Sequence, residues 1–323
     1  MERYVFSGSL TDEMKELLEN MPDFEPLDIL NTQIDRGTCD KLMSWKADGF
    51  CRWFLLDSGA FSIHTQKCPQ RFLPENGGVD FYIEYINEKD DLIDVCAQLD
   101  TIPGKFGLPK SPEDYENSAQ GSWDNFLYMR SKIKSPNKVM PVYHMGEDIK
   151  YLGRMLDYED EHGKLEWVGI SPANDRSKED RMIFLGNVYD YIKKSNNPEV
   201  KTHVYGFTSL DAMSKYPCTT ADSITHRLLS GYAKIISYDH GIISVSKRDR
   251  TSKAKSNWSF VDCADEYNLN RLKQEAESMN LTIEQLQESV SARVAFNIKN
   301  IQRLVKTKYK YKSSNLVRQR KLF

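Results

Sequence analysis

The sequence predicts a (β/α)₈ barrel, an α/β fold in which eight parallel strands close into a ring surrounded by helices. Short apolar runs alternate with longer amphipathic stretches along the 323 residues. The runs do not alternate strictly between apolar and polar residues, which is typical of strands buried on both faces. The length suits one barrel with an appendage, and 40% hydrophobic with 28% charged residues is ordinary for a globular protein.

Eight runs are predicted to be the barrel strands, mostly because polar, glycine or proline residues bound them. They are Arg3–Ser7, Leu27–Asn31, Trp53–Asp57, Val95–Asp100, Val139–His144, Trp167–Ser171, Lys201–Gly206 and Cys218–Asp222. The eighth run is weak in β propensity, so its assignment depends on its place in the series.

Helices are predicted where the apolar residues recur at helical spacing. The clearest are Thr11–Asn20, Asp80–Lys89, Lys178–Ser195, Ser209–Lys215 and Thr282–Thr307. The last of these carries an apolar stripe that we expect to pack against the barrel. The stripe consists of Leu286, Val290, Val294, Ile298, Ile301 and Val305.

Two further patterns bear on the organisation of the chain. The β-rich runs on either side of Tyr238–Gly241 predict a hairpin. The segment Thr101–Trp123 is rich in Pro, Gly and Ser, and we expect a loop that could act as a lid. The sequence therefore predicts a catalytic barrel over residues 1–231 and, over 232–323, a hairpin with a basic helical extension that packs on it.

Cysteine usage and hydropathy exclude several classes of protein. The six cysteines are scattered and no two have C-x₂-C spacing, which argues against both a structural zinc site and a disulfide framework. We expect buried free thiols in a reducing compartment. No apolar run reaches the roughly 20 residues of a membrane span, and the first ten residues lack a signal pattern. A cytoplasmic protein is expected.

Charge is unevenly distributed along the chain. The segment from Lys247 to the C-terminus has 17 basic and 8 acidic residues, whereas the rest has 27 basic and 39 acidic residues. A basic segment can hold a polyanion by counterion release, so nucleic-acid contact is one interpretation. The other is a solvated helix end that aids solubility.

Polar residues end several of the predicted strands, where barrel enzymes carry their chemistry. They are Asn31, Asp57, Asp100, His144, Ser171 and Asp222. A single aspartate at such a place can simply cap the following helix. Three aspartates at strand ends together favour a catalytic site, because buried carboxylates are costly unless they are paired or used.

The motif DSGAFS at Asp57–Ser62 resembles the DSGGFQ motif of tRNA-guanine transglycosylases. Weaker resemblances follow in the same order as in that family. LNT resembles the family's LGNT, and QLD resembles a strand that ends in a base-recognising aspartate. VYGF resembles MGVG, and ADSITHR resembles FDCVLPTR. VYH and VGIS lie where the family has VQG and GGLAVG. The resemblance runs from about Tyr4 to the C-terminal helix and implies a barrel enzyme that exchanges a base in a nucleic acid.

Three departures narrow the resemblance. The zinc subdomain of the family, with its CxCxxC…H ligands, is absent from the sequence, the VQG glutamine is replaced, and the proline of PTR becomes a threonine in THR. This pattern resembles the DpdA-type branch, which inserts 7-deazaguanine bases into DNA, largely in phage and bacterial modification systems. In a phage-encoded protein the compartment would be the host cytoplasm.

The resemblance implies a role for each strand-end residue. Asp222 is the nucleophile that attacks C1′, Asp57 is the general acid/base, and Asp100 accepts from the amidine edge of guanine. Asn31, Ser58 and Gly59 are expected near the base or ribose, backbone groups of Gly169 and Ile170 near the base carbonyl, and Tyr143 or His144 in place of the glutamine. Phe61 is expected either to stack on the base or to be a core aromatic, and His144 has a buried structural histidine as its alternative.

Phosphate contacts are expected from basic residues after the last strand, since the base must be flipped out or presented on a single strand. They are Arg227, Lys247, Arg248, Arg250, Lys253, Lys255, Lys306, Lys308 and Lys310. The reaction implies no metal and no organic cofactor. Its co-substrate would be a 7-deazaguanine base of the preQ0 type, and a second copy of the chain or other modification proteins are open as partners.

Three alternatives remain open at the level of sequence. The first is the same exchange on tRNA. The second is a base-excising or glycoside hydrolase, in which the same paired carboxylates use water as the acceptor. The third is a non-catalytic nucleic-acid-binding barrel, since fold alone does not fix function.

Overall fold

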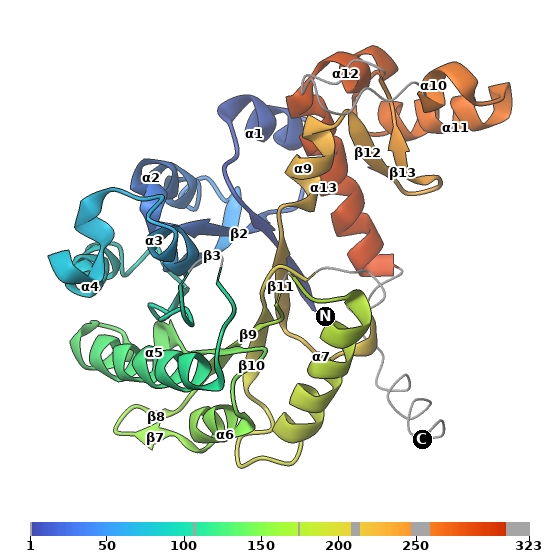
Figure 1. The fold of residues 1–323 in the computed structure, drawn as a ribbon. Helices are drawn as coiled ribbons and strands as arrows, with labels where there is room; N and C mark the ends of the chain where they lie inside the picture. The colour runs from blue at the N-terminus through green and yellow to red at the C-terminus, as the bar shows by residue number, and fades with distance from the viewer. Residues whose placement is uncertain (1, 106–107, 174, 208–213, 247–258, 308–323) are drawn as a thin grey trace.

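The structure, a computed structural model, describes residues 2–105, 108–173, 175–207, 214–246 and 259–307. Its centre is a ring of parallel strands with helices around it (Figure 1), so the expected α/β barrel is confirmed. The strands of the ring lie in the order β5-β4-β3-β2-β1-β11-β10-β9-β6.

The ring strands agree closely with the eight predicted runs. They are β1 Arg3–Ser7, β2 Leu27–Thr32, β3 Cys51–Asp57, β4 Val95–Ala97, β5 Val139–Met140, β6 Val142–His144, β9 Trp167–Ser171, β10 Lys201–Val204 and β11 Thr220–Ser223. Two antiparallel pairs lie outside the ring: β7 Glu159–Asp160 with β8 Gly163–Lys164, and the predicted hairpin, β12 Lys234–Ser237 with β13 Gly241–Ser244.

The helices follow the strands on the outside of the ring. They are α1 Asp12–Glu19, α2 Arg36–Ser44, α3 Ala60–His64, α4 Gly78–Glu88, α5 Pro112–Lys132, α6 Ile149–Asp157, α7 Lys178–Ile192, α9 Thr225–Gly231, α10 Phe260–Cys263, α11 Glu266–Glu277, α12 Ile283–Glu288 and α13 Val290–Thr307. Short 3₁₀ turns are η1 Gln33–Asp35, η2 Gln70–Phe72, η3 Pro74–Asn76 and η4 Pro136–Lys138. Most of the predicted helix Ser209–Lys215 lies outside the described residues.

The ring closes at the interrupted run that contains Pro141. Met140 of β5 pairs with β4 on one side, and Val142 of β6 pairs with β9 on the other. Proline has no N–H to donate, but the Pro141 carbonyl accepts the Gly169 N–H at 2.8 Å. β5 and β6 therefore act as one strand, and eight runs complete the barrel.

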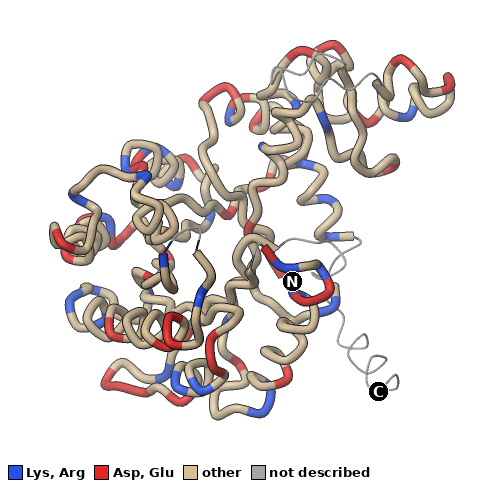
Figure 2. Tube along the Cα trace, in the orientation of Figure 1, with Lys and Arg blue, Asp and Glu red and all other residues tan. Residues whose placement is uncertain are grey.

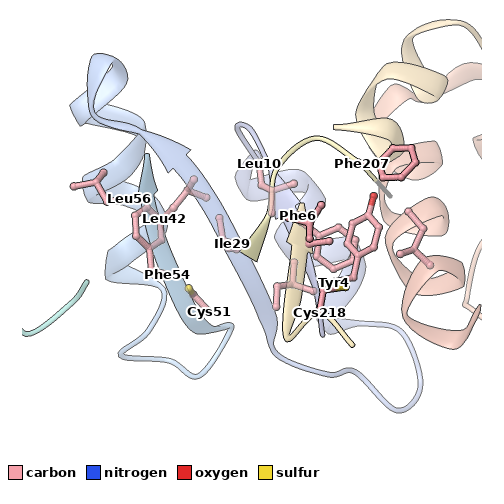
Figure 3. Packing of buried hydrophobic residues seen from close by; sticks show 14 of the residues in the cluster. Tyr4, Phe6, Leu10, Ile29, Leu42, Cys51, Phe54, Leu56, Phe207 and Cys218 are labelled. Carbon is pink, nitrogen blue, oxygen red and sulfur yellow. The ribbon is translucent and has the colours of Figure 1, made fainter. Parts of the chain in front are cut away.

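Apolar side chains fill the barrel on both sides of the sheet. The interior cluster consists of Val5, Leu30, Trp53, Leu55, Val95, Met140 and Trp167. A larger cluster, part of which is drawn in Figure 3, fills the layer between the strands and the helices. The Trp53 and Trp167 rings lie with their centroids 5.5 Å apart. These tryptophans come from the early part of their strands, so they close the interior at the amino ends.

A buried carboxylate joins the strands at the same amino end. Asp28 has a fully buried side chain that accepts hydrogen bonds from Arg52 Nε and Nη2 at 2.8 and 2.7 Å, and Arg3 Nη1 lies 3.6 Å from it. The Arg3 guanidinium also lies 5.0 Å from the Trp53 ring centre. A bidentate pair of this kind fixes β1, β2 and β3 relative to one another.

The predicted C-terminal helix is two helices that break at Ser289. Thr282 caps the first with a capping box that includes Gln285, as its sequence position suggested. The predicted stripe is inward-facing along both helices, and α13 packs against α1, α9, β1 and β12. Figure 1 shows the hairpin and α10–α12 gathered beside α9 and the beginning of α13.

The expected loop over Thr101–Trp123 is wrong for its second half. α5 begins at Pro112, and Ser111 forms a capping box with Asp114. Proline is tolerated at the first helical position because its missing N–H would have no partner there. Small residues of α5, such as Ser118 and Ser122, are buried against the barrel. The small residues that suggested a loop therefore form the face of α5 that packs on the barrel.

Two expectations from composition can also be compared with the structure. All six cysteines are free, but only four are buried, since Cys68 is partly exposed and Cys263 is exposed. Within the described residues, the structure contains no helix that is both long enough and apolar enough to cross a membrane.

Candidate functional site

The three strand-end aspartates meet at the carboxyl mouth of the barrel. Asp57 ends β3, Asp100 follows β4, and Asp222 lies on β11. Burial first, and then the charges of Asp100 and Asp222, raise the pKa of Asp57 to about 7 against the opposing backbone hydrogen bonds from Gly59 and Ser58. The effect of Asp100 and Asp222 on Asp57, and their shared place at the carboxyl ends of the strands, shows that the structure brings these sequence-predicted residues together.

The turn after β3 holds Asp57 in place. The Gly59 N–H donates to Asp57 Oδ2 at 3.0 Å. Gly59 has φ of 72°, and an added Cβ would lie 2.4 Å from Ile34 Cγ1 and 2.6 Å from Thr32 Oγ1. Ser58 is buried, and its carbonyl accepts the Gln33 amide at 3.0 Å. Ser58 and Gly59 thus shape the turn, and only glycine fits its second position.

Phe61 follows this turn on α3. Its ring is 63% exposed, so the expectation that it is a barrel core aromatic is wrong. Phe61 therefore lies at the surface, close in sequence to Asp57.

Asp222 is anchored through one oxygen. Its Oδ1 accepts the Gly206 N–H at 2.8 Å and lies 3.4 Å from His203 Nε2. Among the residues that the structure describes, none donates a hydrogen bond to the second oxygen, Oδ2. The described residues therefore hold one oxygen of Asp222, Oδ1.

Two side chains of β10 and its end complete this part of the site, and the sequence reasoning missed both. His203 is fully buried, and its Nδ1 lies 2.8 Å from Thr220 Oγ1. The Tyr205 ring stands edge-on to His203 with centroids 4.5 Å apart. The two residues alternate on one face of the strand, and that spacing was the signal available in the sequence.

Tyr205 lies beneath the carboxylates. Its pKa is raised well above the usual value by burial and then by Asp57, Asp100 and Asp222. Its hydroxyl is buried without a hydrogen-bond partner among the described residues. A Cβ on Gly169 would lie 3.0 Å from Tyr205 Cε2, so the glycine leaves room for the ring.

Asp100 belongs to a chain of charged side chains that includes His144 and Glu147. Gln98 Nε2 donates to Asp100 Oδ1 at 2.9 Å, and His144 Nε2 lies 3.3 Å from Asp100 Oδ2. His144 Nδ1 lies 3.0 Å from Glu147 Oε1. Burial would lower the pKa of His144, but Asp100 and Glu147 outweigh it and raise the pKa to about 10. Glu147 is a third residue that the sequence reasoning missed.

His144, rather than Tyr143, occupies the barrel mouth. Tyr143 belongs to the outer apolar layer, where its hydroxyl donates to the Glu147 carbonyl at 3.0 Å and its ring stacks on Phe184. Strand alternation explains the choice, because neighbouring residues point to opposite faces of the sheet. The expectation that Tyr143 reads the base is therefore wrong.

Other predicted base contacts are already used by the sheet. The Gly169 N–H donates to the Pro141 carbonyl, and the Ile170 carbonyl accepts the Tyr205 N–H at 2.9 Å. Asn31 follows Leu30, whose side chain is in the barrel interior, so Asn31 faces the opposite side of β2. Its Oδ1 accepts the Thr32 N–H at 2.8 Å. The Gly169 N–H, the Ile170 carbonyl and the Asn31 side chain are therefore not directed at a base in the mouth.

The predicted phosphate contacts fall into three groups. Arg227 is exposed on α9, and its Nη1 donates to the Ser9 carbonyl, just after β1, at 3.1 Å. It therefore lies at the rim near Asp222. Lys306 forms an ion pair with Glu25, which precedes β2 at the amino end of the barrel. Lys306 therefore lies at the end of the barrel opposite the three aspartates, and its predicted phosphate contact would be remote from them. The rest lie outside the described residues: Lys247, Arg248, Arg250, Lys253, Lys255, Lys308 and Lys310.

Basic positions lie along α13 (Figure 2), and its four basic side chains contact neighbouring parts of the protein. Arg293 is buried and donates to the carbonyls of Ser230, Leu286 and Gln287. Lys299 donates to the Pro22 carbonyl at 2.9 Å. The Arg303 guanidinium lies 4.0 Å from the Tyr238 ring centre. In the described part of the chain, the basic C-terminal residues hold α13 to the barrel and the hairpin.

Comparisons with known proteins leave the identity of the chain open. No family model matches it, and no curated protein matches it. Among solved structures it is similar to a GH10 endoxylanase retrieved from a sugarcane soil metagenome, with 14% identity over 64% of this chain and 68% of that chain, and a TM-score of 0.38. A similarity at this level does not inform the site or the activity.

Proposed function

We propose that the protein is a guanine transglycosylase that exchanges guanine in DNA for a 7-deazaguanine base through a covalent aspartyl intermediate. The observation that carries this proposal is that two carboxyl groups at one barrel mouth differ in their surroundings. Asp57 has a pKa of about 7, and Asp222 is anchored through Oδ1 with Oδ2 unengaged by described residues. The motif resemblance centred on DSGAFS supplies the substrate class.

In the first step, Asp222 Oδ2 forms a bond to C1′ of the nucleotide as the bond from C1′ to guanine N9 breaks. The bonding electron pair leaves with guanine, and protonated Asp57 gives a proton to the departing base. A group with a pKa near 7 is suited to this work, since it holds and releases a proton at neutral pH. The Gly206 N–H keeps the other oxygen of Asp222 fixed, and His203 Nε2 lies 3.4 Å from that oxygen.

In the second step, the incoming 7-deazaguanine attacks C1′ through N9. Its N9 proton passes to the Asp57 carboxylate, and Asp222 leaves with the electron pair of its ester bond. Two displacements at one carbon retain its configuration, as in retaining glycosidases. Asp57 and Asp222 return to their starting states, so the exchange needs no further reactant.

Recognition of the polymer requires that the target base reach the carboxylates. A base inside a duplex cannot reach carboxylates at a barrel mouth, so it must be flipped out or presented on a single strand. In this proposal the exposed Arg227 contacts the backbone and the exposed Phe61 stacks on the base. The sequence lacks the cysteine cluster of the zinc subdomain, which favours DNA over tRNA.

The test is incorporation of a labelled 7-deazaguanine base into DNA and, separately, into tRNA. We expect label in DNA with the wild-type protein and none with Asp222→Asn, which keeps the shape but cannot form the ester. Asp190→Asn is the matched control, because Asp190 is exposed on the outside of α7. Its activity should equal that of the wild type.

The other outcomes distinguish the alternatives. Label in tRNA alone would replace DNA with tRNA as substrate. Release of free guanine without incorporation would identify a hydrolase. Equal label in DNA with wild type and Asp222→Asn would overturn the assignment of the nucleophile.

A further inference from the structure

We propose that His144, held by Glu147, donates a hydrogen bond to the O6 carbonyl of guanine beside Asp100, so that the two side chains together select guanine-type bases. This inference rests on the proposed function and deepens it, because it names the atoms that select the base. It also adds Glu147 as a positioning residue.

The geometry fixes the imidazole ring on both sides. Glu147 Oε2 accepts the His144 backbone N–H at 3.0 Å, and Glu147 Oε1 lies 3.0 Å from Nδ1. The Glu147 side chain is only 2% exposed, so it cannot turn away into solvent. The Nδ1 nitrogen must then carry a proton, and the ring plane is set by a side chain three residues along the same turn.

The other ring nitrogen faces the mouth. His144 Nε2 lies 3.3 Å from Asp100 Oδ2, which is at the long limit of a hydrogen bond, and the His144 side chain is 27% exposed. A proton on Nε2 can therefore be shared with a ligand that enters the mouth. Gln98 holds the other oxygen of Asp100, so the carboxylate orientation is fixed as well.

The resulting order of polar atoms complements one face of guanine. His144 Nε2 is a donor, and Asp100 Oδ2 and Oδ1 are acceptors. The Watson–Crick edge of guanine presents the O6 acceptor, the N1–H donor and the N2 amino donor. A 7-deazaguanine has the same edge, since it differs at position 7. Adenine presents an amino donor and an N1 acceptor, and both would oppose this array.

The donor role requires that His144 remains an imidazolium at neutral pH. The charged groups that face it are Asp100 from the end of β4 and Glu147 from the loop after β6, and its neighbour on β9 is the uncharged Ser171. With two carboxylates in contact, the pKa of His144 is about 10, so the ring carries both protons across the neutral range.

The experiment measures binding of free labelled bases by equilibrium dialysis, without catalysis. Guanine is compared with 2-aminopurine, which keeps the amino group but lacks O6 and the N1 proton. One good bidentate recognition pair corresponds to about 10- to 100-fold discrimination. We expect His144→Leu to reduce the preference for guanine about tenfold or more, and His144→Gln, whose amide can donate, to restore most of it. His162→Leu, at an exposed site on the β7–β8 turn, is the matched control.

A second measurement keeps the inference testable if a variant folds poorly. NMR titration of the wild-type histidines should show His144 protonated well above pH 8, and Glu147→Ala should lower that pKa and make guanine preference fall between pH 6 and pH 9. An unchanged preference in His144→Leu, or a wild-type His144 that titrates near pH 6.5, would overturn the inference. If the wild type binds guanine but incorporates no label, the inference stands and the transglycosylase proposal fails; if it binds no guanine, the inference fails.

Discussion

Replacing Asp57 with asparagine should stabilise the protein at alkaline pH while abolishing its chemistry. The pKa of Asp57 rises from an ordinary 3.8 to about 7 because burial and two neighbouring carboxylates disfavour its charge. Between these values the folded protein holds a proton that the unfolded chain has released. The free energy of unfolding therefore falls as the pH rises from about 4. Above about pH 7 Asp57 is ionised in both the folded and the unfolded protein, and the loss of stability from burying its charge is complete.

The magnitude follows from linkage. One pKa unit corresponds to about 1.4 kcal/mol, and between pH 5 and pH 8 the cost of Asp57 grows by roughly 2.6 kcal/mol. The side chain is partly exposed at the mouth, so solvent reduces this to roughly 2 kcal/mol. Asparagine keeps the size and the acceptor for the Gly59 N–H but has no charge to lose.

The assay is thermal unfolding at pH 5 and at pH 8 for wild type, Asp57→Asn and the surface control Asp190→Asn. All other titrating groups are common to the proteins and cancel in the comparison. We expect the melting temperature of Asp57→Asn to gain about 4 °C on wild type as the pH goes from 5 to 8. An Asp57→Asn advantage that is the same at both pH values would refute the perturbed carboxyl.

Three further predictions concern single sites. His226 is fully buried and burial lowers its pKa to about 3, so this one group should cost the folded protein about 2 kcal/mol as the pH falls from 7.5 to 5; in urea titrations His226→Leu should therefore gain about 2 kcal/mol relative to wild type over that interval. Gly59→Ala combines a positive φ with a 2.4 Å clash and should cost about 2 kcal/mol or more, whereas Gly49→Ala, with a similar φ and open space, should cost about 1 kcal/mol; equal melting temperatures would contradict the close-approach argument. Asp28→Ala should cost about 2 kcal/mol yet leave guanine binding unchanged, because Asp28 lies at the opposite end from the mouth, and a matching loss in dialysis would count against that separation.

The strands and the aspartates were predictable because both leave local signals. Short apolar runs that end in a polar residue reveal a buried parallel strand, and even the weak run Cys218–Asp222 was placed correctly by its position in the series. The carboxyl ends of parallel strands meet at one edge, which brought Asp57, Asp100 and Asp222 together. The structure extends this prediction with the turn at Gly59 that orients the first of them.

The misses have a different origin. The roles of His203, Tyr205 and Glu147 depend on contacts with residues that are remote in sequence or turned by a tight loop, and composition does not encode such contacts. Tyr143 was placed at the wrong face because the phase of a strand interrupted by a proline is ambiguous from sequence. Net charge did not distinguish a lysine that contacts a ligand from Lys306, whose charge is paired with Glu25 on the far side of the barrel.

The packing of side chains at the amino end of the barrel has a kinetic consequence for the proposed exchange. Trp53, Trp167 and the Arg52–Asp28 pair lie at the amino end of the described barrel, so in the proposed exchange both bases pass Asp57 and Asp222 at the carboxyl mouth. The departing guanine and its replacement must then take turns at one opening. The exchange should obey ping-pong kinetics, and guanine should compete directly with the incoming base rather than bind alongside it.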